Sequence, residues 1–195
     1  MSAPAHDFGG GFTDPGTDAQ RVFRLVLEAM SRPGRIVSLP ALAAPPSMSP
    51  AAGSTLLALA DFETPVWLGA EVRDAAPWLR FETGSPIVDQ PGDAVFAVAR
   101  ADAPPPLGSL PLGSDEYPDC GATLILEVRR LGDAGPLRLA GPGIAVAQRL
   151  GVEGVAEAFW RQRAGLADIF PRGVDLVLTS GCRLAAIPRT TVVES

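Results

Sequence analysis

The chain has 195 residues, 47% of them apolar and 19% charged, so its length favours a single domain with a substantial buried core. Its 16 basic and 22 acidic side chains give a net charge of −6, which provides no driving force for nonspecific binding to nucleic acid. All the basic residues are arginine, so a Schiff base on lysine and a phosphate-binding loop that uses lysine are both excluded. The one histidine is His6, which disfavours catalysis or metal binding by histidine.

The first segments predict an arm followed by a helix. Residues 1–17 are rich in Gly and Pro, and we expect a flexible N-terminal arm there, ahead of a single domain over residues 18–195. The run DAQRVFRLVLEAMSRPG predicts a helix that Thr17 or Asp18 caps and Pro33-Gly34 ends. Helical spacing places its apolar side chains on one buried stripe: Val22, Phe23, Val26, Leu27 and Met30.

The rest of the chain alternates between strand and helix signals. Residues 35–39 predict a strand, 40–50 a proline-rich loop, 54–60 a short buried helix and 66–68 an inner strand. Further strands are expected at 79–83, 94–99, 123–129, 137–140, 174–179 and 184–188, and a long helix at 153–166. Hairpins are expected between 123–129 and 137–140 and between 174–179 and 184–187. These elements predict an α/β protein with a mixed sheet.

The turn Gly141-Pro142-Gly143 is the first candidate for binding an anion. It separates a strand that ends at Ala140 from an apparent helix start at Ile144. Unpaired N–H groups in such a turn can bind phosphate, and a helix N-terminus adds partial positive charge. The alternative is an ordinary strand-to-helix turn, which also favours glycine.

The segment after Pro188 is the second candidate. Arg189 is followed by Thr190 and Thr191, and a guanidinium beside hydroxyl groups can clamp a phosphate or carboxylate. The alternative is an arginine paired with a surface acid.

Two acidic residues occur in apolar contexts. Asp61 follows a leucine-rich segment and Asp175 lies within GVDLVL. A buried carboxylate needs a partner, so we expect each to pair with an arginine or a turn N–H rather than to act as a general base. Cys120 and Cys182 show no CxxC spacing and are expected to be reduced, partly buried thiols.

We expect no targeting signal. A secretory signal has a basic start and an apolar run. Residues 1–20 contain neither an arginine nor an apolar run. No stretch approaches the roughly 20 apolar residues of a spanning helix. We therefore expect a cytoplasmic protein without a membrane partner.

Eight segments in a fixed order carry a family resemblance: DAQRVFRLVLEAMSRPG, LADFETPVWL, LRF, SPIVDQP, GATLILEV, LRLAGPGI, FPRGVDLVLT and RLAAIPRTT. Together they resemble the H subunit of the bacterial phosphonate carbon–phosphorus lyase core complex over nearly all of residues 18–194. Nothing is carried over to residues 1–16 or to the proline-rich links at 40–50 and 101–113.

The resemblance implies a mixed-sheet, three-layer fold like a reduced domain of the pyridoxal-phosphate-dependent transferases, without that cofactor. It also implies a homodimer that joins the G, I and J subunits in a cytoplasmic assembly. That assembly uses ATP as a substrate to form ribose-1-phosphonate-5-triphosphate from an alkylphosphonate, and a radical enzyme later cleaves the carbon–phosphorus bond. The resemblance assigns no catalytic residue and no metal to the H subunit.

The residues and the resemblance together suggest three hypotheses for the function of this chain. The first is an accessory, non-catalytic or assisting subunit of the lyase complex. The alternative is a component that binds nucleotide or phosphonate through five candidate ligands: Arg80, Gly141, Gly143, Arg189 and Thr190. A stand-alone transferase with pyridoxal phosphate is the third, and the missing lysine argues against it.

Overall fold

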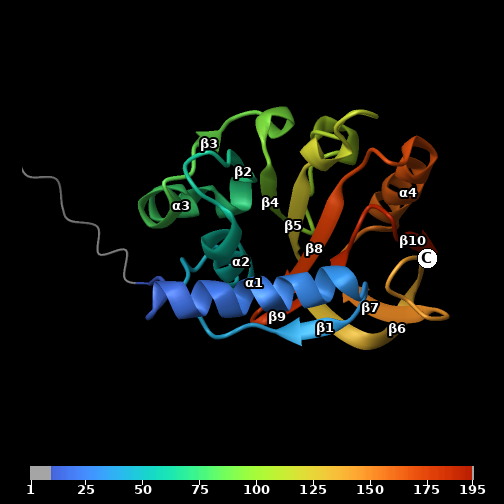
Figure 1. Cartoon of the computed structure of the whole chain (residues 1–195), viewed down its shortest axis with the longest axis horizontal. Coiled ribbons are helices and arrows are strands. Elements are labelled where there is room, and N and C mark those ends of the chain that lie inside the picture. The colour runs from blue at the N-terminus through green and yellow to red at the C-terminus, as the bar shows by residue number, and fades with distance from the viewer. Residues whose placement is uncertain (1–9, 195) are drawn as a thin grey trace, which may run out of the picture.

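The computed structural model describes residues 10–194, which fold around a seven-stranded mixed sheet with strand order β1-β9-β8-β5-β4-β2-β3 (Figure 1). The strands are β1 Ile36–Ser38, β2 Val66–Leu68, β3 Ile87–Val88, β4 Phe96–Arg100, β5 Thr123–Glu127, β8 Asp175–Ser180 and β9 Arg183–Ile187. The α/β class with a mixed sheet is therefore confirmed.

Strand pairing divides this sheet into a parallel part and an antiparallel edge. β3, β2, β4, β5 and β8 are parallel, whereas β9 pairs antiparallel with β8 and with β1. The hairpin predicted between 174–179 and 184–187 is confirmed, with Gly181 at φ +58° in its two-residue turn. The hairpin predicted between 123–129 and 137–140 is wrong, because β5 pairs with β4 and β8 and residues 132–135 lie inside another strand.

Both faces of the central strands are buried. In β5, Ile125 belongs to one hydrophobic core, whereas Leu124 and Leu126 belong to the core on the opposite face. Val177 of β8 shares a core with Ile125. Successive side chains of a strand point to opposite faces, so a parallel strand covered on both sides is apolar throughout.

Three helices cover the first face: α1 Pro15–Ser31, α2 Pro50–Leu59 and α3 Ala76–Thr83. They contribute Val22, Val26, Leu56 and Leu79 to the first core. None of the helices within residues 10–194 combines the length and apolar character that a membrane crossing requires.

A second, three-stranded antiparallel sheet of order β10-β6-β7 and helix α4 cover the other face (Figure 1). Its strands are β6 Arg130–Ala140, β7 Gln148–Glu153 and β10 Val192–Glu194, and the helix is α4 Glu157–Gly165. Leu139, Leu150 and Val193 of the small sheet join Phe159 and Trp160 of α4 in the second core. The large sheet is thus the middle of three layers.

Helix α1 begins earlier than predicted. Asp14, and not Thr17 or Asp18, is the N-cap, because its carboxylate accepts a hydrogen bond from the backbone N–H of Thr17 at 3.4 Å. Pro15 takes the first helical position, where its missing N–H breaks no helical hydrogen bond.

The buried stripe of α1 is narrower than predicted. Val22, Val26 and Ala29 are buried. Phe23 and Leu27, which were expected on the same stripe, are 48% and 55% exposed. Two apolar side chains therefore lie on the outer face of this helix.

The strand predicted at 79–83 is wrong, because these residues form the second half of α3. Pro77 lies in the first turn of this helix and Gly84 caps its end at φ +74°, both of which are helix-end signals. The helix predicted at 54–60 begins at Pro50, and the one predicted at 153–166 begins at Glu157.

Contacts join the segment before α1 to the domain. The indole Nε1–H of Trp78 donates to the carbonyl oxygen of Gly10 at 2.8 Å, and Phe12 packs against the first core. The remainder of the arm expected from the sequence, residues 1–9 with His6, lies outside the described residues.

Candidate functional site

The turn Gly141-Pro142-Gly143 is not followed by a helix, so the helix start predicted at Ile144 is wrong. The turn ends β6 and leads through a loop to β7, and the Ile144 N–H donates to the Gly141 carbonyl oxygen at 3.1 Å. Without a helix, the turn has no macrodipole with which to attract phosphate.

Close backbone contacts explain the two glycines of this turn. Gly141 has φ +135° and Gly143 has φ +82°. A Cβ at Gly141 would lie 2.9 Å from the Thr190 carbonyl oxygen, and a Cβ at Gly143 would overlap the carbonyl oxygen of Ser31 at the end of α1. The turn therefore packs against two other segments, which is the structural role that glycine serves in such positions.

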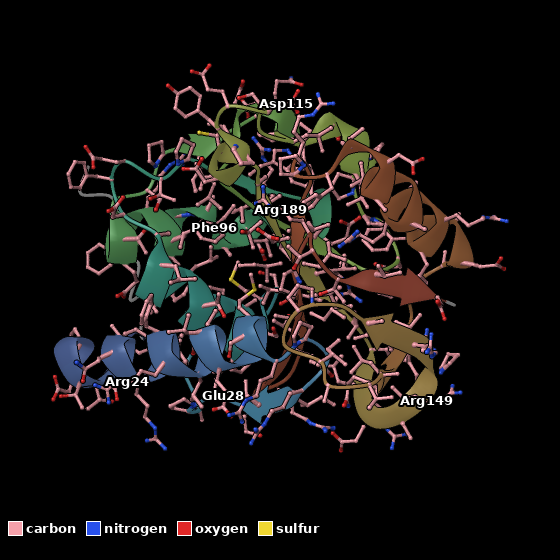
Figure 2. The ribbon with its side chains drawn as sticks, turned by 45° about the vertical axis from the view of Figure 1, so that its right-hand side comes forward. Arg24, Glu28, Phe96, Asp115, Arg149 and Arg189 are labelled. Atoms are coloured by element: carbon pink, nitrogen blue, oxygen red, sulfur yellow. The ribbon has the colours of Figure 1, made fainter. Side chains whose placement is uncertain are left out.

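Arg189 is held inside the protein by an ion pair with Asp175. Its Nη2 lies 2.6 Å from the Asp175 carboxylate, and the same carboxylate accepts the Arg189 backbone N–H at 2.7 Å. The guanidinium also donates to the carbonyl oxygens of Pro118 and Gly121. Figure 2 shows Arg189 within the molecule, away from the edge at which Arg24 lies. The arginine partner expected for Asp175 is thus present.

Asp61, by contrast, is exposed. Its carboxylate accepts hydrogen bonds from the Thr64 hydroxyl at 2.7 Å and the Glu63 N–H at 2.9 Å. These bonds, the Thr64 bond most of all, lower the pKa of the Asp61 carboxyl. The buried setting expected from the neighbouring leucines is wrong, although the expected turn N–H partner is found.

A second buried arginine lies near the same ion pair. Arg163 of α4 is 2% exposed, and its Nη2 donates to the carbonyl oxygens of Pro188 and Thr191 at 2.8 and 3.1 Å. Burial lowers the pKa of the Arg163 guanidinium, while the charge of Asp175 opposes that shift. Arg163 thus holds the segment between β9 and β10 against α4.

The five candidate ligands predicted from the sequence do not all come together. Gly141 contacts the backbone of Thr190, which directly follows Arg189. Arg80 belongs to α3, which packs in the first core, whereas the strands flanking Gly141 and Thr190 pack in the second core on the other side of the large sheet. Arg80 and Thr190 are both exposed.

A cleft of about 240 Å³ lies elsewhere, at the carboxyl ends of β4, β5 and β8. This edge of a parallel sheet is where open α/β folds bind ligands. Three polar residues from these strands line the cleft. Arg100 ends β4, Glu127 ends β5, and Thr179 lies one residue before the end of β8. Sequence reasoning missed them, although a polar residue that closes an apolar strand is the signal that marks this edge.

The N-terminus of α2 closes one side of this cleft. The Glu127 carboxylate accepts the backbone N–H of Ser49, the N-cap of α2. The Ser49 hydroxyl accepts the N–H of Ala52 and donates to the Thr179 hydroxyl, both at 3.2 Å. The N–H of Ala51 donates to the Gly181 carbonyl oxygen at 3.0 Å. The donors at this helix end are used within the protein, and Glu127 occupies the place of an external anion.

The charges of the cleft balance. Two arginines, Arg100 and Arg129, and two acids, Asp102 and Glu127, line it, and Arg100 lies 3.6 Å from Asp102. Such a lining does not favour a polyanion. Within residues 10–194, no three His, Cys, Asp or Glu side chains gather in a way that could hold a metal ion. Cys182 is half-buried, as expected, whereas the partly buried position expected for Cys120 is wrong because this residue is exposed; neither forms a disulfide.

Comparison with known proteins identifies the family. Residues 10–194 match the model of the family described as bacterial phosphonate metabolism protein (PhnH). The chain is 38% identical, over its whole length and 99% of the relative, to "Alpha-D-ribose 1-methylphosphonate 5-triphosphate synthase subunit PhnH" of Rhizobium meliloti (strain 1021). It is 47% identical over 83 residues, 43% of each chain, to "Putative C-P lyase subunit protein HtxG" of Stutzerimonas stutzeri. The chain therefore belongs to the PhnH family of bacterial phosphonate metabolism proteins.

Proposed function

We propose that the chain is an accessory subunit of a carbon–phosphorus lyase system, required for forming ribose-1-phosphonate-5-triphosphate from an alkylphosphonate and ATP. The observation that carries this proposal is the 38% identity to a synthase subunit over the whole of this chain and 99% of the relative. The second relative, named as a C-P lyase subunit, points to the same system.

The residue chemistry supports an assisting rather than a catalytic role. The chain has no lysine and one histidine, and its two most buried arginines hold backbone carbonyls and Asp175. The alternative, a component that binds nucleotide or phosphonate, is not favoured. The guanidinium of Arg189 is engaged within the protein, and the Gly141 turn has no helix behind it.

We also propose that the three-layer arrangement of this fold resembles a reduced domain of the pyridoxal-phosphate-dependent transferases. That cofactor is held by a lysine Schiff base in those enzymes, and this chain has no lysine with which to form one. The residues therefore do not fit the cofactor, and no step of the reaction is assigned to it.

We also propose the setting in which the subunit acts. It is a homodimer in the cytoplasm that joins the G, I and J subunits, and ATP is a substrate of the assembled system. Two exposed apolar side chains on α1, Phe23 and Leu27, are consistent with contacts to other chains.

Complementation tests the function. In Rhizobium meliloti lacking its PhnH subunit, expression of this chain is expected to restore growth with methylphosphonate as the sole phosphorus source, whereas an empty vector does not. Growth on inorganic phosphate is the control and should be the same in both strains. Conversion of methylphosphonate and ATP by the purified chain alone would contradict the accessory role.

A further inference from the structure

The outer face of α1 presents apolar side chains that the core does not use. Phe23 and Leu27 are one helical turn apart and 48% and 55% exposed, so they lie on the same side of the helix. Their neighbours Val22 and Val26 are in the first core. An aromatic and a branched apolar side chain held together on a rigid helix is a feature of protein interfaces.

A groove of about 620 Å³ begins where α1 ends. The groove is lined by the loop from Gly143 to Gln148 and by Arg32, Pro33, Arg35, Ile36 and Asp133. Val146 at the tip of this loop is 87% exposed. Because Gly143 packs against the carbonyl of Ser31, the loop is fixed to the end of α1. We call Phe23, Arg24, Leu27 and this groove the α1 surface.

The charge of the α1 surface is opposite to that of the rest of the chain. Residues 18–35 contain four arginines, one Asp and one Glu, and Asp133 also lines the groove, so the net charge there is +1, while the whole chain carries −6. Glu28 is 3.2 Å from Arg35 and 3.8 Å from Arg32. The side chains of Arg21 and Arg24 have no hydrogen bond or ion pair within the part of the chain that the structure describes. Figure 2 shows Arg24 and Glu28 on this edge.

We propose that the α1 surface is a docking site for an apolar segment with acidic flanks that belongs to a different subunit of the lyase system. The unpaired cations would meet the acidic side chains, and Phe23, Leu27 and the groove would receive the apolar ones. The proposal rests on the proposed function, because that function supplies the other subunits.

Two other occupants fit less well. A second copy of the chain, packed face to face across a two-fold axis, would place two copies of the same net-positive surface against each other, and like charges at an interface are repulsive. An anionic membrane would match the charge, but the main apolar face of α1 is buried in the core, which leaves a small apolar area for insertion: Phe23, Leu27 and the loop residue Val146.

Co-purification of a paired variant tests the proposal. A tagged chain is expressed with the G, I and J subunits of its own organism, as wild type, as Arg24→Glu/Leu27→Gln, and as the control Arg161→Glu/Phe62→Gln. All four changed side chains are exposed, and the new residues on α1 favour helix. The first variant is expected to retain the other subunits at least about tenfold less than wild type, as for loss of an interface hot spot. The control should stay within about twofold.

Further measurements separate the possible outcomes. The melting temperature of each purified variant must match that of wild type. If Arg24→Glu/Leu27→Gln melts lower, the milder variant Arg24→Gln/Leu27→Gln replaces it. Retention of the subunits by both α1 variants overturns the docking site alone, whereas failure of the wild-type chain to retain any subunit overturns the proposed function as well. A changed oligomeric state of the isolated α1 variants would assign the surface to a second copy. Sedimentation of wild type, but not of the variants, with phosphatidylserine vesicles would assign it to a membrane.

Discussion

The carboxylate of Asp175 binds the backbone N–H, Nε and Nη2 of Arg189, and the two side chains are 15% and 14% exposed. Asp175 opens β8 and Arg189 follows β9, so the pair joins the open ends of one hairpin. The same guanidinium donates to the carbonyls of Pro118 and Gly121, which precede β5. One ion pair thus connects three segments at the amino ends of the parallel strands.

Replacing Arg189 by Ala is expected to lower the free energy of unfolding by about 3 kcal/mol, because it leaves the largely buried Asp175 carboxylate unpaired. In a chain of this size, the melting temperature should fall by roughly 6–12 °C. Arg189→Ala/Asp175→Ala should lose less than the two single changes added together, which a double-mutant cycle measures by calorimetry. Arg161→Ala, which removes an exposed pair with Glu157, is the control and should cost less than about 1 kcal/mol.

Arg163→Met is expected to loosen the C-terminal segment. Methionine keeps an apolar stem of similar length, but the carbonyls of Pro188 and Thr191 lose their donor, at about 1–3 kcal/mol for each group left unsatisfied. Hydrogen exchange should accelerate in β10 and its partner β6 more than in β5. Equal exchange in both regions would show that Arg163 does not hold this segment.

Gly143→Ala and Gly165→Ala should have opposite effects. Gly143 has φ +82° and faces the Ser31 carbonyl, whereas nothing lies within 4 Å of a Cβ at Gly165. The first change is expected to lower the free energy of unfolding by about 2 kcal/mol, and the second to leave it unchanged or raise it by about 0.5 kcal/mol. Thermal melts of the two variants test this difference, and equal losses would contradict the packing of the turn against α1.

The existence of most strands could be predicted from the sequence, but not their partners. The inner residues of β4, β5 and β8 are apolar without alternation, which is typical of parallel strands with two buried faces. β6 instead alternates buried and exposed residues near its end, as a half-exposed antiparallel strand does. Gly132 and Gly135 favour a turn between 123–129 and 137–140, which is why the sequence predicts a hairpin there, but glycine also fits the irregular register between β6 and β7.

The site was harder to predict than the fold. The sequence predicts an arginine or turn N–H partner for Asp175, and for Arg189 an anion or a surface acid, but the pairing of these two residues depends on strands that meet only in the folded sheet. The contacts of Gly141 with Thr190 and of Gly143 with Ser31 join segments far apart in the chain. Local patterns predict that a glycine is needed and do not say which backbone it approaches.

The acid stability of the protein should depend on Asp61. Hydrogen bonds from Thr64 and then Glu63 lower the pKa of this carboxyl below its ordinary 3.8, so the folded state binds its proton more weakly than the unfolded state. The stability that the ionised carboxylate contributes is therefore complete above the ordinary pKa and is lost as the pH falls through the lowered one. Asp61→Asn keeps an oxygen acceptor without the charge. The difference in melting temperature between wild type and this variant should be largest at neutral pH and should disappear in acid.

Glu82 provides a control of opposite sign. Burial raises the pKa of the Glu82 carboxyl above 4.5, so the folded state binds this proton more tightly than the unfolded state, and ionisation of Glu82 lowers stability as the pH rises. Glu82→Gln should accordingly melt higher than wild type at neutral pH and lose that advantage in acid. Melting curves of both variants across the acid range test the two signs together. A gap for Asp61→Asn that stays constant with pH would show that the Thr64 and Glu63 bonds do not favour the charged form.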